Sequence, residues 1–241
     1  MGVVKNILKQ LLKQTTIVEK KKLSDAAYRI KLKGGHIKNA EFTPGYFLRV
    51  GVGLQESDLS LHDSIRSYSV WDIDQREGTL DMAVATHSKG SGADWSEQCK
   101  VGETVFFNWK KGKFILDNTA DSYLFIGDLS ALSHLYIITR NLPQNKQVES
   151  VLYSQDARDF FPDVNGERPF NMYQMPENPT VQVIGKIKEI VPNMKGEKMV
   201  YIAGDSRLCL SLTQYFRKEL GWKTTQIKTK PFWNPDKKGL E

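Results

Sequence analysis

Arg66 and Tyr68 stand two residues apart in the stretch HDSIRSYSVWDID, residues 62–74, with Ser67 between them and Ser69 next. Alternate side chains of a β-strand lie on one face, so this spacing places a cation beside an aromatic ring. A guanidinium group binds phosphate through paired hydrogen bonds, and an aromatic ring stacks on a flat heterocycle. The pattern therefore has two interpretations: a strand that binds a flavin dinucleotide, or a surface arginine stacked on a tyrosine without any ligand.

A glycine-rich segment, HSKGSGADW at residues 87–95, precedes a short helix that we expect from about Ala93 to Cys99. Backbone amides at the start of a helix bind phosphate, and glycine allows a ligand to approach the backbone closely. His87, at the head of the segment, is either a structural residue or a flavin contact. We assign it no acid–base role.

Two Gly-Asp pairs, Gly127-Asp128 and Gly204-Asp205, each end an expected apolar strand. Ligands of open α/β sheets bind outside such strand ends, so each pair is either an ordinary turn or part of a ligand site. Further along, Arg158 lies in the acidic stretch SQDARDFFPD. The arginine suits the 2′-phosphate of NADPH, whereas the neighbouring acids suit the free ribose of NADH, and the sequence leaves both open.

Lysines are concentrated in the C-terminal stretch WKTTQIKTKPFWNPDKKGLE, and the whole chain has a net charge of +6. Lys228 and Lys230 share a face of an expected strand that Lys223 precedes. They are either solvated surface charges or a basic rim that attracts an anionic ligand. The sequence contains no recognised nucleic-acid-binding motif, so nucleic acid is not an expected partner.

The elements that must position these residues are β-strands in the first half of the chain. Apolar or alternating runs that are bounded by turn residues predict strands. We expect them near residues 26–32, 46–52, 65–73, 78–87 and 103–109. Short strands with turns between them are typical of an antiparallel barrel or sandwich.

The second half of the chain alternates strands with helices. We expect strands near residues 122–127, 148–154 and 198–204, and helices near 130–142 and 206–221. This alternation predicts a parallel, doubly wound sheet. The predicted fold class is an N-terminal antiparallel β-barrel at residues 1–118, followed by an α/β domain at residues 119–241.

Composition excludes several classes of site. The two cysteines, Cys99 and Cys209, are too few for a disulfide framework or a four-cysteine iron–sulfur cluster, and a reducing cytoplasm fits them. The histidines show no metal-site spacing, so we expect no metal site. No apolar run is long enough to span a membrane. Residues 1–14 predict an amphipathic helix that docks on the protein itself or, less favoured, on a membrane surface.

Five segments, taken in order, resemble motifs of the siderophore-interacting proteins, the FAD-dependent ferric-siderophore reductases of the ferredoxin–NADP reductase superfamily. The Arg-x-Tyr-Ser strand resembles the flavin signature of the superfamily. The five are HSKGSGADW, VGETV, YLFIGDLSALSHLYIITRNLP, YIAGDSRLCLSLTQYFRKELGW and KTKPFWNPDKKG. The resemblance extends over about residues 15–239. It implies an FAD domain followed by a nicotinamide-type domain.

The motifs and the resemblance together predict the site residues. The FAD-binding set is Arg66, Ser67, Tyr68, Ser69, His87, Lys89, Gly90, Ser91, Gly92, Ala93, Trp95, Phe232 and Trp233. The nicotinamide-binding set is Gly127, Asp128, Ser130, Arg158, Gly204 and Asp205, and the substrate-binding set is Lys223, Lys228 and Lys230. Ala93 stands where the family has a serine hydroxyl, so Ser91 is the expected replacement.

The resemblance implies that the chain reduces a ferric siderophore and releases ferrous iron in the cytoplasm. Electrons would reach FAD from NAD(P)H or from a ferredoxin, and no side chain is assigned a catalytic role. Two alternatives remain. A general NAD(P)H-flavin or ferredoxin reductase would share the flavin motifs but lack a basic rim, and a non-catalytic flavin or siderophore carrier would bind without turnover.

Overall fold

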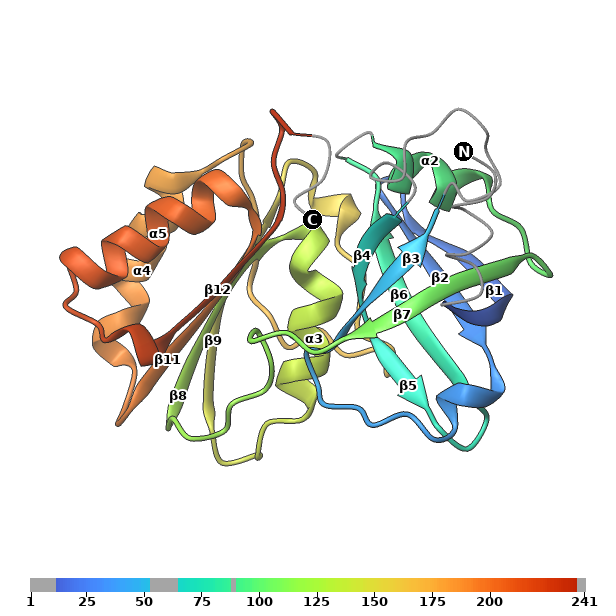
Figure 1. The fold of residues 1–241 in the computed structure, drawn as a ribbon. Coiled ribbons are helices and arrows are strands. Elements are labelled where there is room, and N and C mark those ends of the chain that lie inside the picture. The colour runs from blue at the N-terminus through green and yellow to red at the C-terminus, as the bar shows by residue number, and fades with distance from the viewer. Residues whose placement is uncertain (1–11, 53–64, 88–89, 238–241) are drawn as a thin grey trace. The chain divides into compact units, whose positions relative to one another are not determined.

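An antiparallel sheet accounts for the alternating segments of the first half of the chain (Figure 1). The structure is a computed structural model that describes residues 12–52, 65–87 and 90–237. Within these residues, the strands are β1 (Lys13–Ser24), β2 (Ala27–Lys33), β3 (Phe47–Gly51), β4 (Ile65–Ser69), β5 (Asp72–Asp74), β6 (Thr79–Ala85) and β7 (Thr104–Lys110). Their order across the sheet is β4-β3-β7-β1-β2-β6-β5.

The two edges of this sheet belong to one run of chain. Strands β4 and β5 lie at opposite ends of the strand order, yet only Val70 and Trp71 separate them. The amide of Val70 donates to the Tyr46 carbonyl at 3.4 Å, and the amide of Trp71 donates to the Asp81 carbonyl at 2.8 Å. The sheet therefore curls round on itself into a barrel, as the sequence predicts.

Apolar side chains fill this barrel, and one short helix follows β6. The buried set includes Ile17, Ile30, Leu32, Leu48, Val50, Leu80, Met82, Val105 and Phe107. Helix α2 (Ser91–Gln98) comes next in the chain, and a 3-10 turn (Gly35–Ile37) follows β2. A helix of only two turns is marginal on its own, so α2 depends on its contacts with the barrel.

A parallel sheet forms the second compact unit, which begins at Lys113, whereas the first unit ends at Gly112. Its strands are β8 (Ser122–Asp128), β9 (Gln147–Ser154), β10 (Met172–Gln174), β11 (Lys198–Asp205) and β12 (Ile227–Trp233). The order is β10-β9-β8-β11-β12, and every recorded pairing is parallel. The chain thus changes direction across the sheet between β8 and β11.

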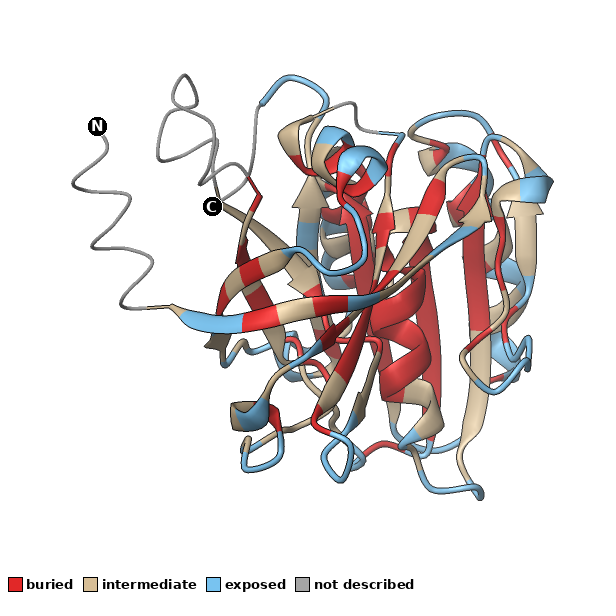
Figure 2. Ribbon diagram, turned by 90° about the vertical axis from the view of Figure 1, so that its right-hand side faces the viewer, coloured by how far each residue is buried: buried red, intermediate tan, exposed pale blue. Residues whose placement is uncertain are grey.

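Helices cover both faces of the parallel sheet (Figure 1). The helices are α3 (Leu132–Arg140), α4 (Thr180–Ile190) and α5 (Ser206–Lys218), with 3-10 turns at Leu129–Ala131, Ala157–Asp159, Val191–Asn193 and Thr224–Gln226. Helices α4 and α5 share one apolar cluster with the sheet. Strand β8 is buried along its whole length and α3 is buried from Leu132 to Ile138, as the red segments of Figure 2 show.

The architecture confirms the fold class that the sequence predicts: an antiparallel barrel-like sheet followed by a parallel α/β sheet. The predicted N-terminal helix falls on residues 1–11, which lie outside the described residues, although Lys13 already belongs to β1. Among the described helices, none is both long and apolar enough to cross a membrane.

Candidate functional site

Arg66 and Tyr68 lie against the first turn of helix α2. A Cβ atom placed on Gly92 would overlap the Tyr68 Oη and would stand 3.4 Å from the Arg66 Cγ. The helix therefore approaches β4 as closely as a glycine allows, and both side chains lie on the strand face that meets α2. The Arg66 guanidinium also donates to the carbonyl of Ile65 at 2.7 Å.

Trp95 stacks on Tyr68 in the same cluster. Their ring centroids are 6.0 Å apart and the planes are inclined by 28°. Gly90 caps the start of α2, and Ser91 is its first residue. The approach to the helix start is uncrowded at Gly90, because a Cβ there would meet nothing within 4 Å. A cation, an aromatic pair and the start of a helix are thus brought together.

The remaining predicted FAD residues of the barrel unit lie around this cluster. Ser69 is buried and Ser67 is half-buried on the other face of β4, where they pair with Phe47 and Arg49 of β3. Ala93 is buried inside the first turns of α2. His87 is exposed just after β6. Lys89 lies outside the described residues.

Lys20 holds the other end of helix α2, a role that no local sequence pattern indicates. Its Nζ on β1 donates to the carbonyls of Glu97 at 2.7 Å and Cys99 at 2.9 Å, in the last turn and the cap of the helix. A cation is favoured there, because unpaired carbonyls give the C-terminal end of a helix a partial negative charge. The lysine thereby fixes the position of α2 against the barrel.

Asp128 is the centre of a hydrogen-bond cluster at the carboxyl ends of β8 and β11. Its Oδ1 accepts from the amide and hydroxyl of Ser130, at 2.8 and 2.5 Å. Its Oδ2 accepts from the amide of Asp205 and the indole Nε1 of Trp233, both at 2.8 Å. The carboxylate is 5% exposed. Four donors satisfy this buried charge, so its role within the described residues is to join β8, β11 and β12.

The two glycines of this region permit that cluster. Gly204 has a φ of 115°, and a Cβ there would overlap the carboxylate of Asp128. A Cβ on Gly127 would stand 2.8 Å from the Cβ of Ala131 and 2.9 Å from the Ala203 carbonyl. Close packing explains both glycines without a ligand. The predicted residues Gly127, Asp128, Ser130, Gly204 and Asp205 are therefore together, as expected, but their hydrogen bonds are largely internal.

The predicted aromatic pair at the end of β12 belongs to the second unit. Phe232 contacts the rings of Phe114 and His134, at centroid distances of 6.5 and 5.6 Å. His134 is fully buried, and its Nε2 lies 3.0 Å from the Phe114 carbonyl. Burial lowers the pKa of His134 to about 3, so the ring is neutral at physiological pH. Trp233 binds Asp128 instead of joining this group.

The three predicted substrate lysines have different surroundings, and Lys228 and Lys230 are alternate residues of β12. Lys228 forms an ion pair with Asp117 at 3.0 Å. Burial alone would raise the pKa of Asp117, but hydrogen bonds from Thr119 and Lys228 outweigh it and lower the pKa. Lys230 lies over the ring of Phe232, 5.7 Å from its centroid. Lys223 is exposed before the start of β12, whereas Lys230 lies toward its carboxyl end.

Arg158 is paired within its own loop. Its Nε lies 3.0 Å from each carboxylate oxygen of Asp156, and its Nη2 lies 2.5 Å from one of them.

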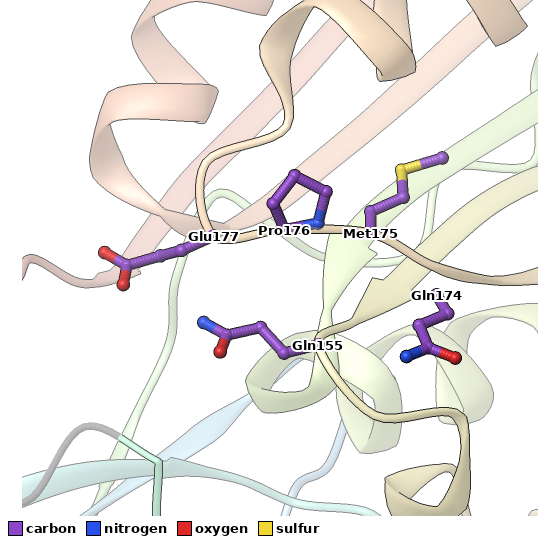
Figure 3. A pocket seen from close by; sticks show the side chains of 5 residues that line it. All are labelled: Gln155, Gln174, Met175, Pro176 and Glu177. Carbon is purple, nitrogen blue, oxygen red and sulfur yellow. The ribbon is translucent and has the colours of Figure 1, made fainter.

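Gln155, the residue before Asp156, lines an open pocket at the carboxyl ends of β9 and β10, which is shown in Figure 3. The pocket is lined by Gln155, Gln174, Met175, Pro176 and Glu177. The sequence analysis missed it, because neutral amides in a loop have no distinctive pattern.

The described residues contain no group of three or more histidine, cysteine or acidic side chains that could hold a metal ion. Cys99 and Cys209 are free thiols, and both are buried. Burial raises the pKa of Cys209 to about 12, which keeps this thiol protonated and unreactive.

Two family models match the chain, one in each half. The model described as "Siderophore-interacting FAD-binding domain" matches residues 49–109, and the model described as "Siderophore-interacting protein" matches residues 120–236. The first range contains β4 and α2, and the second contains the whole parallel sheet. A search of curated protein sequences finds no match.

Solved structures share the fold at low sequence identity. A siderophore utilization protein from T. fusca has a TM-score of 0.76 and 15% identity, with 95% of each chain covered. The siderophore-interacting protein SipS from Aeromonas hydrophila has a TM-score of 0.78 and 16% identity, with 94% of this chain and 92% of that chain covered. The ferredoxin reductase in carbazole 1,9a-dioxygenase has a TM-score of 0.71 and 20% identity over 92% of this chain and 69% of that one.

Proposed function

The chain belongs to the siderophore-interacting protein family, and from this membership we propose that it uses FAD to reduce a ferric siderophore and release ferrous iron. The observation that carries the proposal is the cluster of Arg66, Tyr68, Gly92 and Trp95. It lies inside the residues that match the FAD-binding family model.

The donor set of this cluster fits a flavin dinucleotide. A phosphate group needs a cation and backbone amides, which Arg66 and the first turn of α2 supply. A flat ring system needs an aromatic partner, which the stacked pair of Tyr68 and Trp95 supplies. Gly90 leaves space beside the helix start. In the proposed site, Arg66 binds the pyrophosphate and Tyr68 contacts the isoalloxazine.

FAD, when bound, supplies the link between two-electron donors and one-electron acceptors. The chain's own residues supply binding and orientation. Arg66 holds the phosphates, α2 offers its amides, and Lys20 keeps the helix in position. No side chain needs to move a proton to the iron. The ferric ion belongs to the substrate, and its hard oxygen chelators lose affinity for it when it becomes ferrous.

The electron donor in this proposal is NAD(P)H or a ferredoxin. A nicotinamide would bind at the carboxyl ends of the parallel strands, where ligands of doubly wound sheets are bound. Lys223 and Lys230 remain proposed contacts for an anionic chelate, whereas Lys228 forms an ion pair with Asp117. The basic chain as a whole favours such substrates.

Anaerobic spectroscopy tests the proposal. The purified protein should contain one FAD per chain, and its flavin absorbance should bleach with the donor and return when a ferric siderophore is added. Arg66→Ala should reduce FAD affinity by about 2 kcal/mol, because the phosphate loses a charge-assisted partner. Normal FAD retention by Arg66→Ala would reject the assigned role of Arg66.

The same experiment separates the alternatives. The flavin of a general flavin reductase would be bleached by the donor and reoxidised by free flavins or quinones. Ferric siderophores would not reoxidise it faster than these acceptors do. A carrier would bind the flavin or the siderophore, but its absorbance would not respond to any donor. Either result would overturn the reductase proposal.

A further inference from the structure

We infer that the pocket at the carboxyl ends of β9 and β10 binds the adenosine half of a dinucleotide with a free 2′-hydroxyl, so that NADH rather than NADPH is the nicotinamide donor. This inference rests on the proposed function, since it names the donor of the same reaction. It decides between the two donors that the stretch around Arg158 left open in the sequence, and it adds the pocket residues, which the sequence did not point to.

The pocket lies where the fold leaves room for a ligand. Its lining comes from the residue after β9, the last residue of β10 and the loop that follows, so it is outside the carboxyl ends of two neighbouring parallel strands (Figure 3). In doubly wound sheets, this end of the strands is the side where ligands bind. The site is therefore placed by the topology of the sheet as well as by its shape.

The lining residues suit an adenine base and a ribose. Gln155 and Gln174 carry amides that both donate and accept, as the edge of an adenine requires. Pro176 is exposed and provides apolar surface for the flat face of the base, whereas Met175 is 8% exposed and packs in the core cluster beneath the pocket. Glu177 carries a carboxylate, which accepts hydrogen bonds from ribose hydroxyls.

Arg158 is the cation that a 2′-phosphate would need, and Asp156 already holds it. The guanidinium makes a forked pair with both oxygens of that carboxylate. The amide of Arg158 also donates to Asp156 at 2.9 Å, so the same carboxylate anchors the loop backbone. Hydrogen bonds from Arg158 lower the pKa of Asp156 to about 2, and the carboxylate stays ionised at physiological pH. A phosphate would have to displace this internal partner.

Arg207, which contacts the pocket residue Glu177, is also paired with carboxylates. Arg207 at the start of α5 lies 2.6 Å from Glu177 and 2.6 Å from Asp205. Asp159 adds a further carboxylate on the loop after β9, where it accepts from the Ser154 hydroxyl at 3.2 Å. On the loop after β9 and beside Glu177, the four carboxylates of Asp156, Asp159, Glu177 and Asp205 thus outnumber the two guanidinium groups of Arg158 and Arg207 that they hold. A 2′-phosphate adds about two negative charges to these surroundings, whereas a 2′-hydroxyl adds none.

Binding of 5′-AMP and 2′,5′-ADP tests the inference directly. The protein is first saturated with FAD, so that the flavin site cannot take up the probes, and each Kd is measured by calorimetry. We expect 5′-AMP to bind about tenfold more tightly than 2′,5′-ADP at low salt, with a smaller difference at high salt. Gln174→Ala should weaken both probes.

Two substitutions in the loop give the decisive comparison. Asp156→Asn should free Arg158 and move the preference toward 2′,5′-ADP. Arg158→Ala should leave the 5′-AMP affinity unchanged and should not selectively weaken 2′,5′-ADP. Glu189→Gln, which removes one partner of the exposed ion pair with Lys186 on α4, is the matched control and should change neither Kd.

Three results would overturn the inference: tighter binding of 2′,5′-ADP by the wild type, a selective loss of 2′,5′-ADP in Arg158→Ala, or no binding of either probe. The proposed iron reduction is measured separately, with dithionite as the electron source and a ferric chelate as the acceptor. Failure of that reaction alone would leave the adenosine site intact, and failure of the probes alone would leave the reduction intact.

Discussion

The indole Nε1 of Trp233 donates a hydrogen bond to the Oδ2 of Asp128 at 2.8 Å, although 105 residues separate them in the chain. The bond ties the last strand, β12, to the end of the first strand of the parallel sheet, β8. Asp128 is buried, so the energy of this bond is not screened by solvent in the way that a surface pair would be.

Trp233→Phe should destabilise the parallel unit by about 1.5–3 kcal/mol, because a buried carboxylate loses a donor while the ring volume is largely kept. Urea unfolding followed by circular dichroism measures the loss. Trp222→Phe is the control, since Trp222 packs its ring on Phe216 at a centroid distance of 4.8 Å. Equal losses in the two variants would show that ring volume, rather than the bond to Asp128, sets the cost.

Gly92→Ala should displace helix α2 and lower FAD affinity, because the new Cβ overlaps the Tyr68 Oη. Adding Tyr68→Phe removes that oxygen and should restore much of the affinity, since stacking needs only the ring. Gly185→Ala on α4 is the matched control, because its Cβ meets nothing within 4 Å. If the double variant binds FAD no better than Gly92→Ala, crowding against Tyr68 is not the cause.

Lys228→Gln and Lys230→Gln should have different effects. Lys228→Gln should cost about 1 kcal/mol of stability, because it removes the ionic partner of Asp117. Lys230→Gln should raise the KM for a charged ferric catecholate more than for a neutral hydroxamate complex, and the effect should fade as salt shortens the screening length below about 8 Å. FAD binding should be unchanged. A KM that is unchanged at low salt in Lys230→Gln would remove this lysine from the substrate site.

His134 should make the protein less stable in acid. Its pKa is about 3 in the folded chain, mainly because burial disfavours the cation, against an ordinary value of 6.5. The unfolded chain therefore binds a proton that the folded chain excludes between these two values. Stability should fall as pH drops from about 6.5 toward 3, by about 1.4 kcal/mol per pH unit.

Urea titrations across this pH range measure the slope. His134→Gln removes the titrating group and should flatten the dependence, whereas His87→Gln, at an exposed position, should not. Identical slopes in wild type and His134→Gln would show that other groups control acid unfolding.

The sequence predicted an antiparallel sheet followed by a parallel one, because the spacing of hydrophobic residues along the chain is a local property. The alternation of strands with helices predicted the parallel sheet, and the apolar run of β8 agrees with a strand that is buried on both faces. The spacing of Arg66 and Tyr68 likewise predicted a shared face, and both side chains do lie against Gly92. Their role toward FAD stays a prediction.

The partners of charged side chains could not be predicted from local pattern. The residues around Lys228 in the sequence do not predict its partner Asp117. Those around Lys20 do not predict its bonds to the carbonyls of Glu97 and Cys99. Such contacts form between segments that only the completed fold brings together. For the same reason, the sequence predicted the Gly-Asp pairs to be ligand-binding turns. In the structure, Gly204 makes room for the carboxylate of Asp128.

Closure of the barrel by β4 and β5 would link the lifetime of this unit to FAD, if the flavin binds at the proposed site on β4. Arg66 and Tyr68 lie on β4, the strand whose release would reopen the barrel. A ligand that binds only the closed form stabilises it by about 4 kcal/mol when its concentration is a thousandfold above its Kd. Newly synthesised chains that lack FAD would then open at this seam more often, and proteases would remove them first. Flavin supply would thereby regulate the amount of the protein without any change in its synthesis.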